Sequence, residues 1–277
     1  MTQFQPDASA PLLVFGGPYS NLQATQAIKQ LAEQQQIPAD NIICTGDLVA
    51  YCAQPDATVD LIREWGISVI AGNCEESIGY GASDCGCGFS AGSACDLLSV
   101  AWYNYSVSRV SDSNKAWMRQ LPNQLDFDYG GEAFSAIHAG LDSNNQFIFA
   151  STSVTEKQQP ATRRVILSGH SGIPFGQQTE QGYWLNAGVI GMPANDATAQ
   201  TWYLLIHTEE QQLVCRWHRL DYDHHQAAQQ MASAGLNNGY QQTLSTGLWP
   251  SLDVLPAQEK ARTGNALSLA PLVIPQN

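Results

Sequence analysis

The stretch PLLVFGGPYSNLQATQAIKQLAEQQQIPADNIICTGD, residues 11–47, decides the fold. It begins with a short apolar run that ends in two glycines, and a segment follows in which Leu22, Ile28 and Leu31 recur at helical spacing. A second apolar run, a second helical segment (PDATVDLIREWG) and a third apolar run (ISVIAGN) come next. Strands that alternate with helices at this spacing predict parallel pairing and an α/β fold. Ligands of such sheets bind beyond the carboxyl ends of the strands.

The sequence pattern changes from helical to strand-like after residue 121. Residues 91–121 have a helical pattern, with Ser111 as an N-cap candidate and Pro122 as a stop. Short strand-like runs follow, and they predict a second, mixed or antiparallel sheet packed on the first. These runs are AFSAIHAG, RRVILSGH, YWLNAG, TWYLLIHT and QQLVCRWHRL.

The ends of the chain differ from its middle. Two short helical segments, HHQAAQQMASAG and NNGYQQTLSTG, follow the last strand-like run. From Trp249 onwards the sequence is rich in proline and small residues, so we expect it to be extended or poorly ordered. The predicted organisation is an N-terminal tail (1–10), a single domain (11–248) and a C-terminal extension (249–277).

Charge and hydropathy restrict the partners. The formal net charge of the 277 residues is −13, with only 12 lysines and arginines, which argues against binding to the backbone of a nucleic acid. An anionic substrate would need local attraction, which a metal ion can supply. No apolar run has the length needed to cross a bilayer, and the N-terminus lacks the basic start and apolar core of a secretory signal. We therefore expect a cytoplasmic protein without a membrane partner.

Four metal-competent side chains stand at the ends of predicted strands. They are Asp47, Asn73, His138 and His170, and each has a glycine within two residues that allows a sharp turn. Any one of them alone would be unremarkable as a loop residue. Together they offer a carboxylate, an amide oxygen and two imidazoles, a donor set suited to Mn, Fe, Zn or Co. The sequence therefore predicts a site for a divalent transition metal.

The motifs around these residues resemble those of the calcineurin-like metallophosphoesterases, in particular a small bacterial branch similar to diadenosine-tetraphosphatase-like phosphodiesterases. The resemblance covers about Leu12 to Gly247 and rests on GDLVAYCAQP, GNCE, IHAG, GHSG and LNAGVIGMP. It implies a four-layer αββα sandwich, in which two packed mixed β-sheets are flanked by helices. It also implies metal-dependent hydrolysis of a phosphomonoester or phosphodiester, with a phosphorylated small molecule or nucleotide as the partner.

The departures from the family pattern are selective. The family holds two metal ions, and three ligands of the first are replaced here by Gly17, Tyr19 and Gly172, so that only the shared Asp47 remains. The ligand set of the second ion is complete, as listed above. The resemblance therefore implies at least one ion, while a second is left open.

The catalytic acid of the family is also replaced. Where the family has a histidine that protonates the leaving group, this chain has Cys74, followed by Glu75. Either side chain is a candidate acid, Glu75 if burial raises its pKa.

The cysteines leave two interpretations open. Cys52, Cys74, Cys85 and Cys87 lie near the predicted strand tips, and thiolates are strong ligands for zinc or iron. One hypothesis is a second, sulfur-ligated metal site built from these four residues. The other is that they are small packing residues in a loop that acts as a lid, since a single C-x-C is a weak metal signal.

Substrate contacts are predicted at a strand-to-helix turn. Tyr19, Ser20 and Asn21 precede a predicted helix, whose N-terminus attracts anions. Asn186, in LNAG, matches a family position near the site. Two alternatives to an active enzyme follow from the lost ligands and the thiols. One is a catalytically retired module that binds a nucleotide, a phosphorylated ligand or a protein, and the other is a redox or sensor protein with a cysteine-ligated metal.

Overall fold

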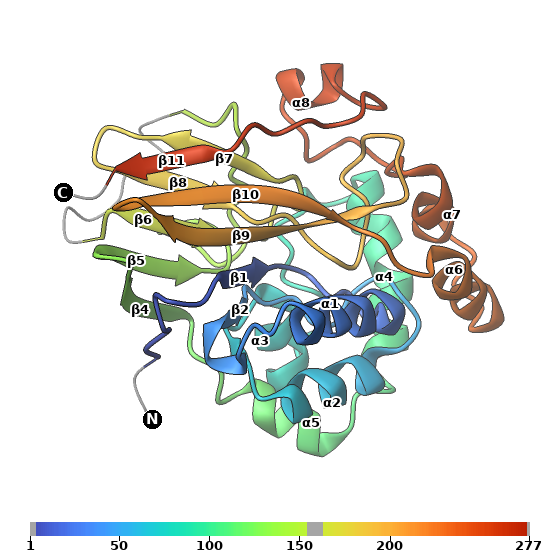
Figure 1. Ribbon diagram of the computed structural model, residues 1–277. Helices are drawn as coiled ribbons and strands as arrows, with labels where there is room; N and C mark the ends of the chain where they lie inside the picture. Colours follow the sequence, from blue (N-terminus) through green and yellow to red (C-terminus); the bar gives the residue numbers. More distant parts are fainter. Residues whose placement is uncertain (1–3, 154–162, 276–277) are drawn as a thin grey trace.

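The computed structural model describes residues 4–153 and 163–275, and its strands form two mixed sheets (Figure 1). The first sheet has the order β11 (Leu272–Pro275), β10 (Gln212–Leu220), β9 (Thr201–Glu209), β1 (Leu12–Phe15), β2 (Ile42–Cys44), β3 (Ser68–Val69). The second has the order β4 (Gln124–Tyr129), β5 (Glu132–Ile137), β6 (Val165–Ser168), β8 (Tyr183–Asn186), β7 (Phe175–Gln178). The predicted α/β fold of two packed mixed sheets flanked by helices is confirmed.

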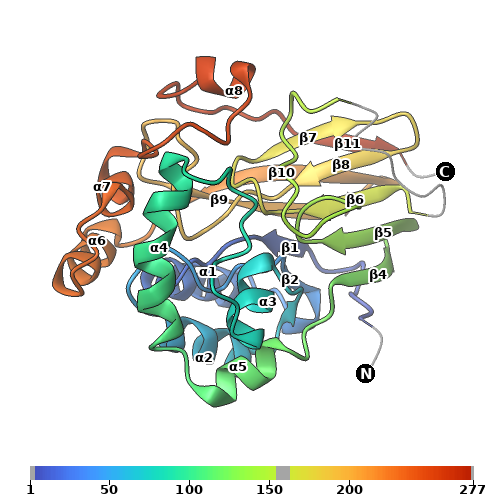
Figure 2. The same ribbon diagram turned by 180° about the vertical axis from the view of Figure 1, so that it is seen from behind.

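Most helices lie on the outer side of the first sheet, as Figures 1 and 2 show from opposite sides, and α8 lies apart from them. The helices are α1 (Leu22–Gln34), α2 (Pro55–Trp65), α3 (Asn73–Tyr80), α4 (Ala94–Val107), α5 (Asp112–Met118), α6 (His224–Ser233), α7 (Gly239–Thr246), α8 (Ala257–Ala261) and the 3₁₀ turn η1 (Ala39–Asn41). The predicted N-cap is confirmed, since the Ser111 side chain accepts a hydrogen bond from the amide of Asn114.

The parallel strands are apolar on both faces, and this explains their continuous hydrophobic runs. In β1, Leu12 and Val14 belong to the core between the sheets, together with Phe134 of the second sheet. The alternate residues Leu13 and Phe15 pack on the helical side. Because side chains alternate across a strand, one four-residue run serves two cores. A smaller cluster that includes Ile148 and Trp184 covers the outer face of the second sheet.

The parallel strands form one side of the first sheet and the centre of the second. In the first sheet β1, β2 and β3 run parallel, and in the second β5, β6 and β8 do. The carboxyl ends of the strands in each set therefore share one edge of their sheet. Polar residues that follow these strands are brought together there.

Two expectations about strands are wrong. The runs that form β9 and β10 were expected in the second sheet, but β9 pairs antiparallel with β1, with Leu205 opposite Leu13. β10 continues the first sheet beside β9. The sequence pattern also gave no warning of β4, β7 and β11.

Both described ends of the chain are anchored to the rest of the protein. The tail was expected to be extended or poorly ordered, but it contains α8, and its strand β11 pairs with β10, with the buried Ile274 opposite Leu213. At the other end, the Asn41 amide donates to the carbonyls of Asp7 and Ala10. Residues 1–3 and 276–277 of the predicted terminal segments lie outside the described residues.

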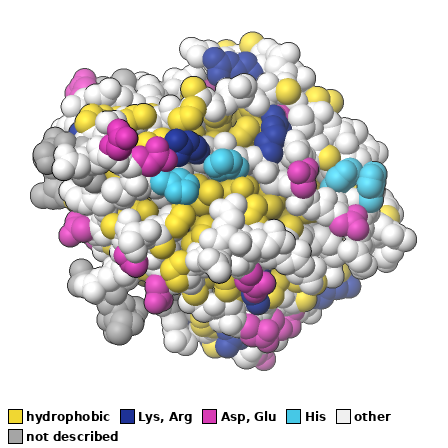
Figure 3. Space-filling view, in the orientation of Figure 1, with side chains coloured by type: hydrophobic (Ala, Val, Ile, Leu, Met, Phe, Trp, Pro, Cys, Tyr) yellow, Lys and Arg dark blue, Asp and Glu magenta, His cyan; other side chains and the backbone are white. Residues whose placement is uncertain are grey.

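One face of the surface mixes charged and apolar side chains. On the face shown in Figure 3, acidic side chains lie singly and in small groups around exposed hydrophobic side chains. No helix within residues 4–153 and 163–275 combines the length and hydropathy of a membrane-crossing segment.

Glycines let the two sheets meet at the edge where the parallel strands end. A Cβ atom on Gly169, after β6, would lie 2.1 Å from Oγ1 of Thr45, which follows β2. A Cβ atom on Gly16, after β1, would lie 2.8 Å from the same oxygen. The Gly16 amide donates to the carbonyl of Gly188 from the second sheet, at 3.0 Å. This contact fixes how closely the two sets of strand tips approach each other.

The Gly169 contact can be tested by Gly169→Ala. We expect the substitution to lower the free energy of unfolding by about 1–3 kcal/mol, because the new methyl overlaps the Thr45 hydroxyl. That hydroxyl is buried without a hydrogen-bond partner, so Thr45→Ala alone should cost little and should recover part of the loss in the double variant. Urea unfolding of the four proteins measures the coupling, and strictly additive effects would contradict the contact.

Candidate metal centre

Asp47 is placed by a tight turn after β2. Gly46 and Asp47 both have positive φ angles, 95° and 57°, which turn the carboxylate out over the end of the strand. A Cβ atom on Gly72, after β3, would lie 2.4 Å from Asp47 Oδ1. Only glycine therefore allows the loop after β3 to pass beside the carboxylate.

Asn73 is the first residue of α3, and its amide is held in one orientation. Nδ2 donates to the carbonyl of Cys85 at 2.9 Å. This leaves Oδ1 facing Nε2 of His138, at 3.1 Å. The loop that carries the cysteines thus positions the amide oxygen of a predicted ligand.

The two histidines come from the second sheet. His138 follows β5, and its Nδ1 lies 2.6 Å from the carbonyl of Thr45. With the proton on Nδ1 donated to that carbonyl, Nε2 presents its lone pair to the centre. His170 follows β6, and its backbone amide donates to the His138 carbonyl. Its Nδ1 lies 3.0 Å from His138 Nε2.

Four donor atoms therefore converge on one point between the sheets. His138 Nε2 lies 3.3 Å from Asp47 Oδ2 and 3.1 Å from Asn73 Oδ1, and His170 Nδ1 lies 3.7 Å from Asp47 Oδ2. Bonds of about 2.0–2.2 Å in a tetrahedral site separate the ligands by about 3.3–3.6 Å. Among the described residues, Asp47, His138 and His170 form the one cluster of acidic, histidine or cysteine side chains close enough for a shared ion. The donor set and its spacing fit a divalent transition metal.

Burial and the charges of the neighbouring groups shift the pKa values in this cluster. Burial raises the pKa of Asp47, but the charge and hydrogen bond of His138, and then those of His170, outweigh it and lower the pKa overall. Burial lowers the pKa of His138, but the Asp47 carboxylate raises it more. Burial lowers the pKa of His170, because the charged imidazolium would lose its solvation. Asp47 thus stays ionised and at least one imidazole nitrogen is free to bind a cation.

Glu75 ties the two strand tips of the first sheet together. Its fully buried carboxylate accepts hydrogen bonds from the amides of Asp47 (2.7 Å), Leu48 (2.8 Å) and Gly72 (2.8 Å). Burial and then the negative charge of Asp47 raise its pKa to about 7, against the opposing effect of the amide donors. The structure thus places this predicted acid against the backbone, where it positions Asp47.

Cys74 lies beside the centre, but it is enclosed. Its amide donates to Asp47 Oδ1 at 3.2 Å, and its sulfur lies 3.5 Å from Asn73 Nδ2. Burial, followed by the charges of Asp47 and Glu75, raises the pKa of the thiol. The side chain is 1% exposed.

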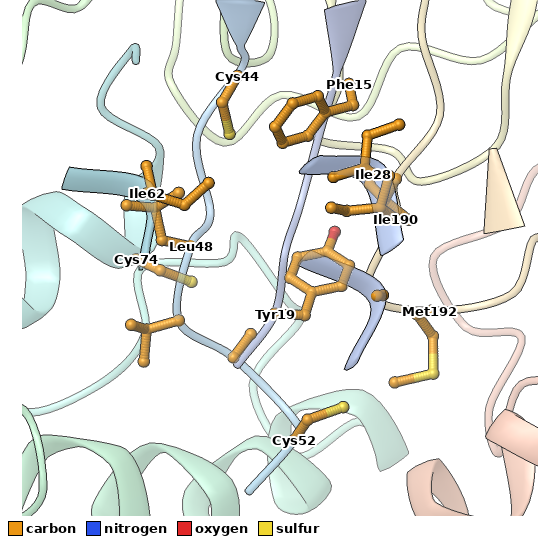
Figure 4. Close-up of a cluster of buried hydrophobic side chains, with 14 of the residues drawn as sticks. Phe15, Tyr19, Ile28, Cys44, Leu48, Cys52, Ile62, Cys74, Ile190 and Met192 are labelled. Carbon is orange, nitrogen blue, oxygen red and sulfur yellow. The ribbon is translucent and has the colours of Figure 1, made fainter. Parts of the chain in front are cut away.

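The structure does not gather the four cysteines into a sulfur-ligated site. Cys85 and Cys87 are joined to each other by a disulfide, so neither offers a thiolate. Cys52 directs its sulfur to the carbonyl of Gly191 at 3.8 Å. In Figure 4, the side chains of Cys52 and Cys74 stand apart.

Aromatic rings occupy the positions where the resemblance implies the first metal. A Cβ atom on Gly17 would lie 2.5 Å from the ring of Tyr19 and 2.8 Å from Val189. A Cβ atom on Gly172 would lie 3.4 Å from the ring of Trp249. Tyr19 packs in the same core cluster as Ile190 and Met192, next to which Figure 4 shows it. Burial, and then the Asp47 charge, raise the pKa of Tyr19, so its hydroxyl stays neutral.

Two of the predicted substrate contacts are engaged within the protein. Asn21 caps α1 by accepting from the Ala24 amide, and its Nδ2 donates to the Gly191 carbonyl. Asn186 accepts from the Gly188 amide and donates to Ser171 beside His170.

The remaining contacts include one that the sequence suggested and two that it did not. Ser20 is buried with an unpartnered hydroxyl. The backbone carbonyl of Thr45 and the ring of Phe147, which lies 4.5 Å from the His170 ring, were not predicted. A backbone role leaves no side-chain signal, and Phe147 lies outside every motif.

The role of Glu75 can be tested by Glu75→Gln. An amide offers one acceptor oxygen and places an NH₂ group against backbone donors, so we expect the free energy of unfolding to fall by about 1–3 kcal/mol. Manganese affinity should fall about 10- to 100-fold, as for other residues that orient ligands. Urea unfolding and calorimetric titration measure the two effects, with Glu76→Gln as the neighbouring control. Unchanged manganese affinity would contradict the positioning role.

Comparisons with known proteins identify a family and similar folds. A family model described as the calcineurin-like phosphoesterase superfamily domain matches residues 21–211. No curated protein matches the chain. The crystal structure of a metallophosphoesterase from Sphaerobacter thermophilus is similar, with a TM-score of 0.66 at 18% identity over 87% of this chain and 100% of that one. The crystal structure of the hypothetical protein PH1004 from Pyrococcus horikoshii OT3 is also similar. Its TM-score is 0.70 at 14% identity, over 86% of this chain and 98% of that one.

At such identities the two crystal structures demonstrate the shared fold alone. The family model goes further because it spans more than half of the chain. Together with the converging carboxylate and imidazoles, it shows that the chain belongs to the calcineurin-like phosphoesterase superfamily, a family of metal-dependent hydrolases.

Proposed function

We propose that the protein hydrolyses a phosphate ester at a single divalent cation held by Asp47, Asn73, His138 and His170. The observation that carries the proposal is the convergence of four donor atoms from two sheets, with His138 Nε2 within 3.3 Å of the other three. The substrate is a phosphomonoester or phosphodiester, such as a nucleotide. The mixed oxygen and nitrogen donors favour Mn, Fe, Zn or Co.

The cation, when bound, supplies Lewis-acid polarisation of a phosphoryl oxygen and offsets its negative charge. The protein's part is to hold the donors rigidly. Thr45 fixes the tautomer of His138, Cys85 fixes the amide of Asn73, and Glu75 fixes the turn at Asp47. Preorganised donors spend no free energy on rearrangement when the substrate arrives.

The proton for the leaving group is the part that departs from the family pattern. Both Cys74 and Glu75 are buried, at 1% and 0% exposure. This burial favours esters whose leaving group departs without an acid from the protein. A donor role for Cys74 predicts that Cys74→Ala slows only those esters whose leaving group needs a proton.

A second candidate function is a catalytically retired module that binds a phosphorylated ligand. It is favoured by the Tyr19 ring, which fills the space beside Gly17 where the resemblance implies a metal ligand. The complete second ligand set favours the enzyme instead.

Removing a ligand should abolish both metal binding and turnover. We expect the wild type incubated with Mn²⁺ to retain close to one equivalent and to hydrolyse bis(4-nitrophenyl) phosphate. Asp47→Ala and His138→Ala should retain almost no metal, because each loses a buried donor that the other three cannot replace. Elemental analysis and absorbance of released nitrophenol measure the outcomes.

The matched control is His207→Ala, since His207 lies on β9 and not among the converging donors. It should bind metal and react as the wild type does. Full metal occupancy in Asp47→Ala or His138→Ala would show that the ligands are wrongly assigned.

The two candidate functions differ in one measurable respect. An enzyme should turn over the diester with at least one of Mn, Fe, Zn or Co. A retired module should show no turnover with any of these metals, while calorimetry should show that it binds a nucleoside monophosphate. Turnover that disappears in His138→Ala would exclude the second candidate.

A further inference from the structure

An aromatic pocket opens beside His170, next to the candidate metal centre. Its lining is dominated by large apolar and aromatic side chains, among them Tyr19, Tyr51, Phe147, His170, Tyr240 and Trp249. Because His170 belongs to both, the pocket lies next to the four-donor centre.

The rings of the pocket pack against one another and against the metal ligand. Tyr51 contacts Tyr19 edge to face, with centroids 4.9 Å apart, and Tyr240 at 4.3 Å. Phe147 packs on the His170 ring at 4.5 Å, and Phe89 stacks on Phe147 at 6.2 Å. Such walls offer both edges and faces to a further planar ring.

Part of the pocket comes from chain beyond the matched family domain, which ends at residue 211. α7 contributes Tyr240, and the following segment contributes Trp249 and Val254. Trp249 is fixed through both its side chain and its backbone. Its Nε1 donates to the Pro193 carbonyl at 2.7 Å, and its backbone amide donates to Asn195 Oδ1 at 2.9 Å. The indole ring that covers Gly172 is therefore held in place as one side of the pocket.

The charges of the pocket decide what it can take. Among the described residues that line it there is no lysine, arginine, aspartate or glutamate. An anionic phosphate placed there would lose its hydration without a compensating charge. The phosphate therefore belongs at the four-donor edge, and the pocket suits a neutral planar group attached to it.

We propose that this pocket binds a planar aromatic substituent of the phosphate ester, so that the substrate class is an aryl or nucleoside ester. The proposal rests on the proposed function in placing the phosphate at Asp47, Asn73, His138 and His170. In place of a second cation, the chain provides Tyr19 and Trp249 to hold the organic part of the substrate.

Calorimetric titration of the Mn²⁺-loaded full chain tests the proposal. Diphenyl phosphate should bind about tenfold more tightly than diethyl phosphate, because it adds ring contacts at the same charge. Trp249→Ala, which removes a wall, and Val254→Phe, which fills the pocket, should each abolish this preference without changing Mn²⁺ affinity. Tyr80→Ala, at an exposed tyrosine outside the pocket, should retain it. Adenosine monophosphate and phenyl phosphate, compared in the same way, distinguish a nucleobase from a phenyl ring.

A second titration separates this inference from the proposed function. The metal-free chain titrated with 4-nitrophenol should show saturable binding that Val254→Phe removes. If Mn²⁺ fails to bind while 4-nitrophenol binds as expected, the proposed function is wrong and the aromatic pocket stands. Equal affinities for diphenyl and diethyl phosphate, or 4-nitrophenol binding that survives in both pocket variants, would overturn the inference.

Discussion

A buried carboxylate that accepts three backbone amides is the constraint on which the centre depends. Glu75 receives the amides of Asp47, Leu48 and Gly72, and so joins the loop after β2 to the loop after β3. With those loops joined, the Asp47 carboxylate and the Asn73 amide face the same point. A carboxyl group that binds only backbone amides is costly to bury. It is retained where it holds functional atoms in place.

The second sheet completes what the first begins. His138 and His170 reach the same point because Gly16 and Gly169 let the strand tips of the two sheets approach within contact distance of Thr45. The carbonyl of Thr45 in turn orients His138. The centre is thus a product of packing between sheets, and no single βαβ unit could form it. Stability of the sheet interface and geometry of the ligands are therefore coupled.

Much of this was predictable, for a physical reason. Polar residues beside glycine at the ends of parallel strands meet at one edge, so Asp47 and His138 could be grouped from the sequence. Sheet membership was not predictable for β9, because pairing with β1 is a contact between distant segments that periodicity does not encode. The acceptor role of Glu75 and the position of Trp249 depend on backbone groups and on a tail whose composition indicated little order.

The Tyr19 ring also limits which substitutions could add a second cation. An aspartate at position 17 would drive its Cβ into that ring, 2.5 Å away, and would gain no partner from Gly172. A histidine at position 19 would find no companion carboxylate at Gly17. Each change is unfavourable until the others have been made, so no gradual path of single substitutions leads from this arrangement to a two-ion centre.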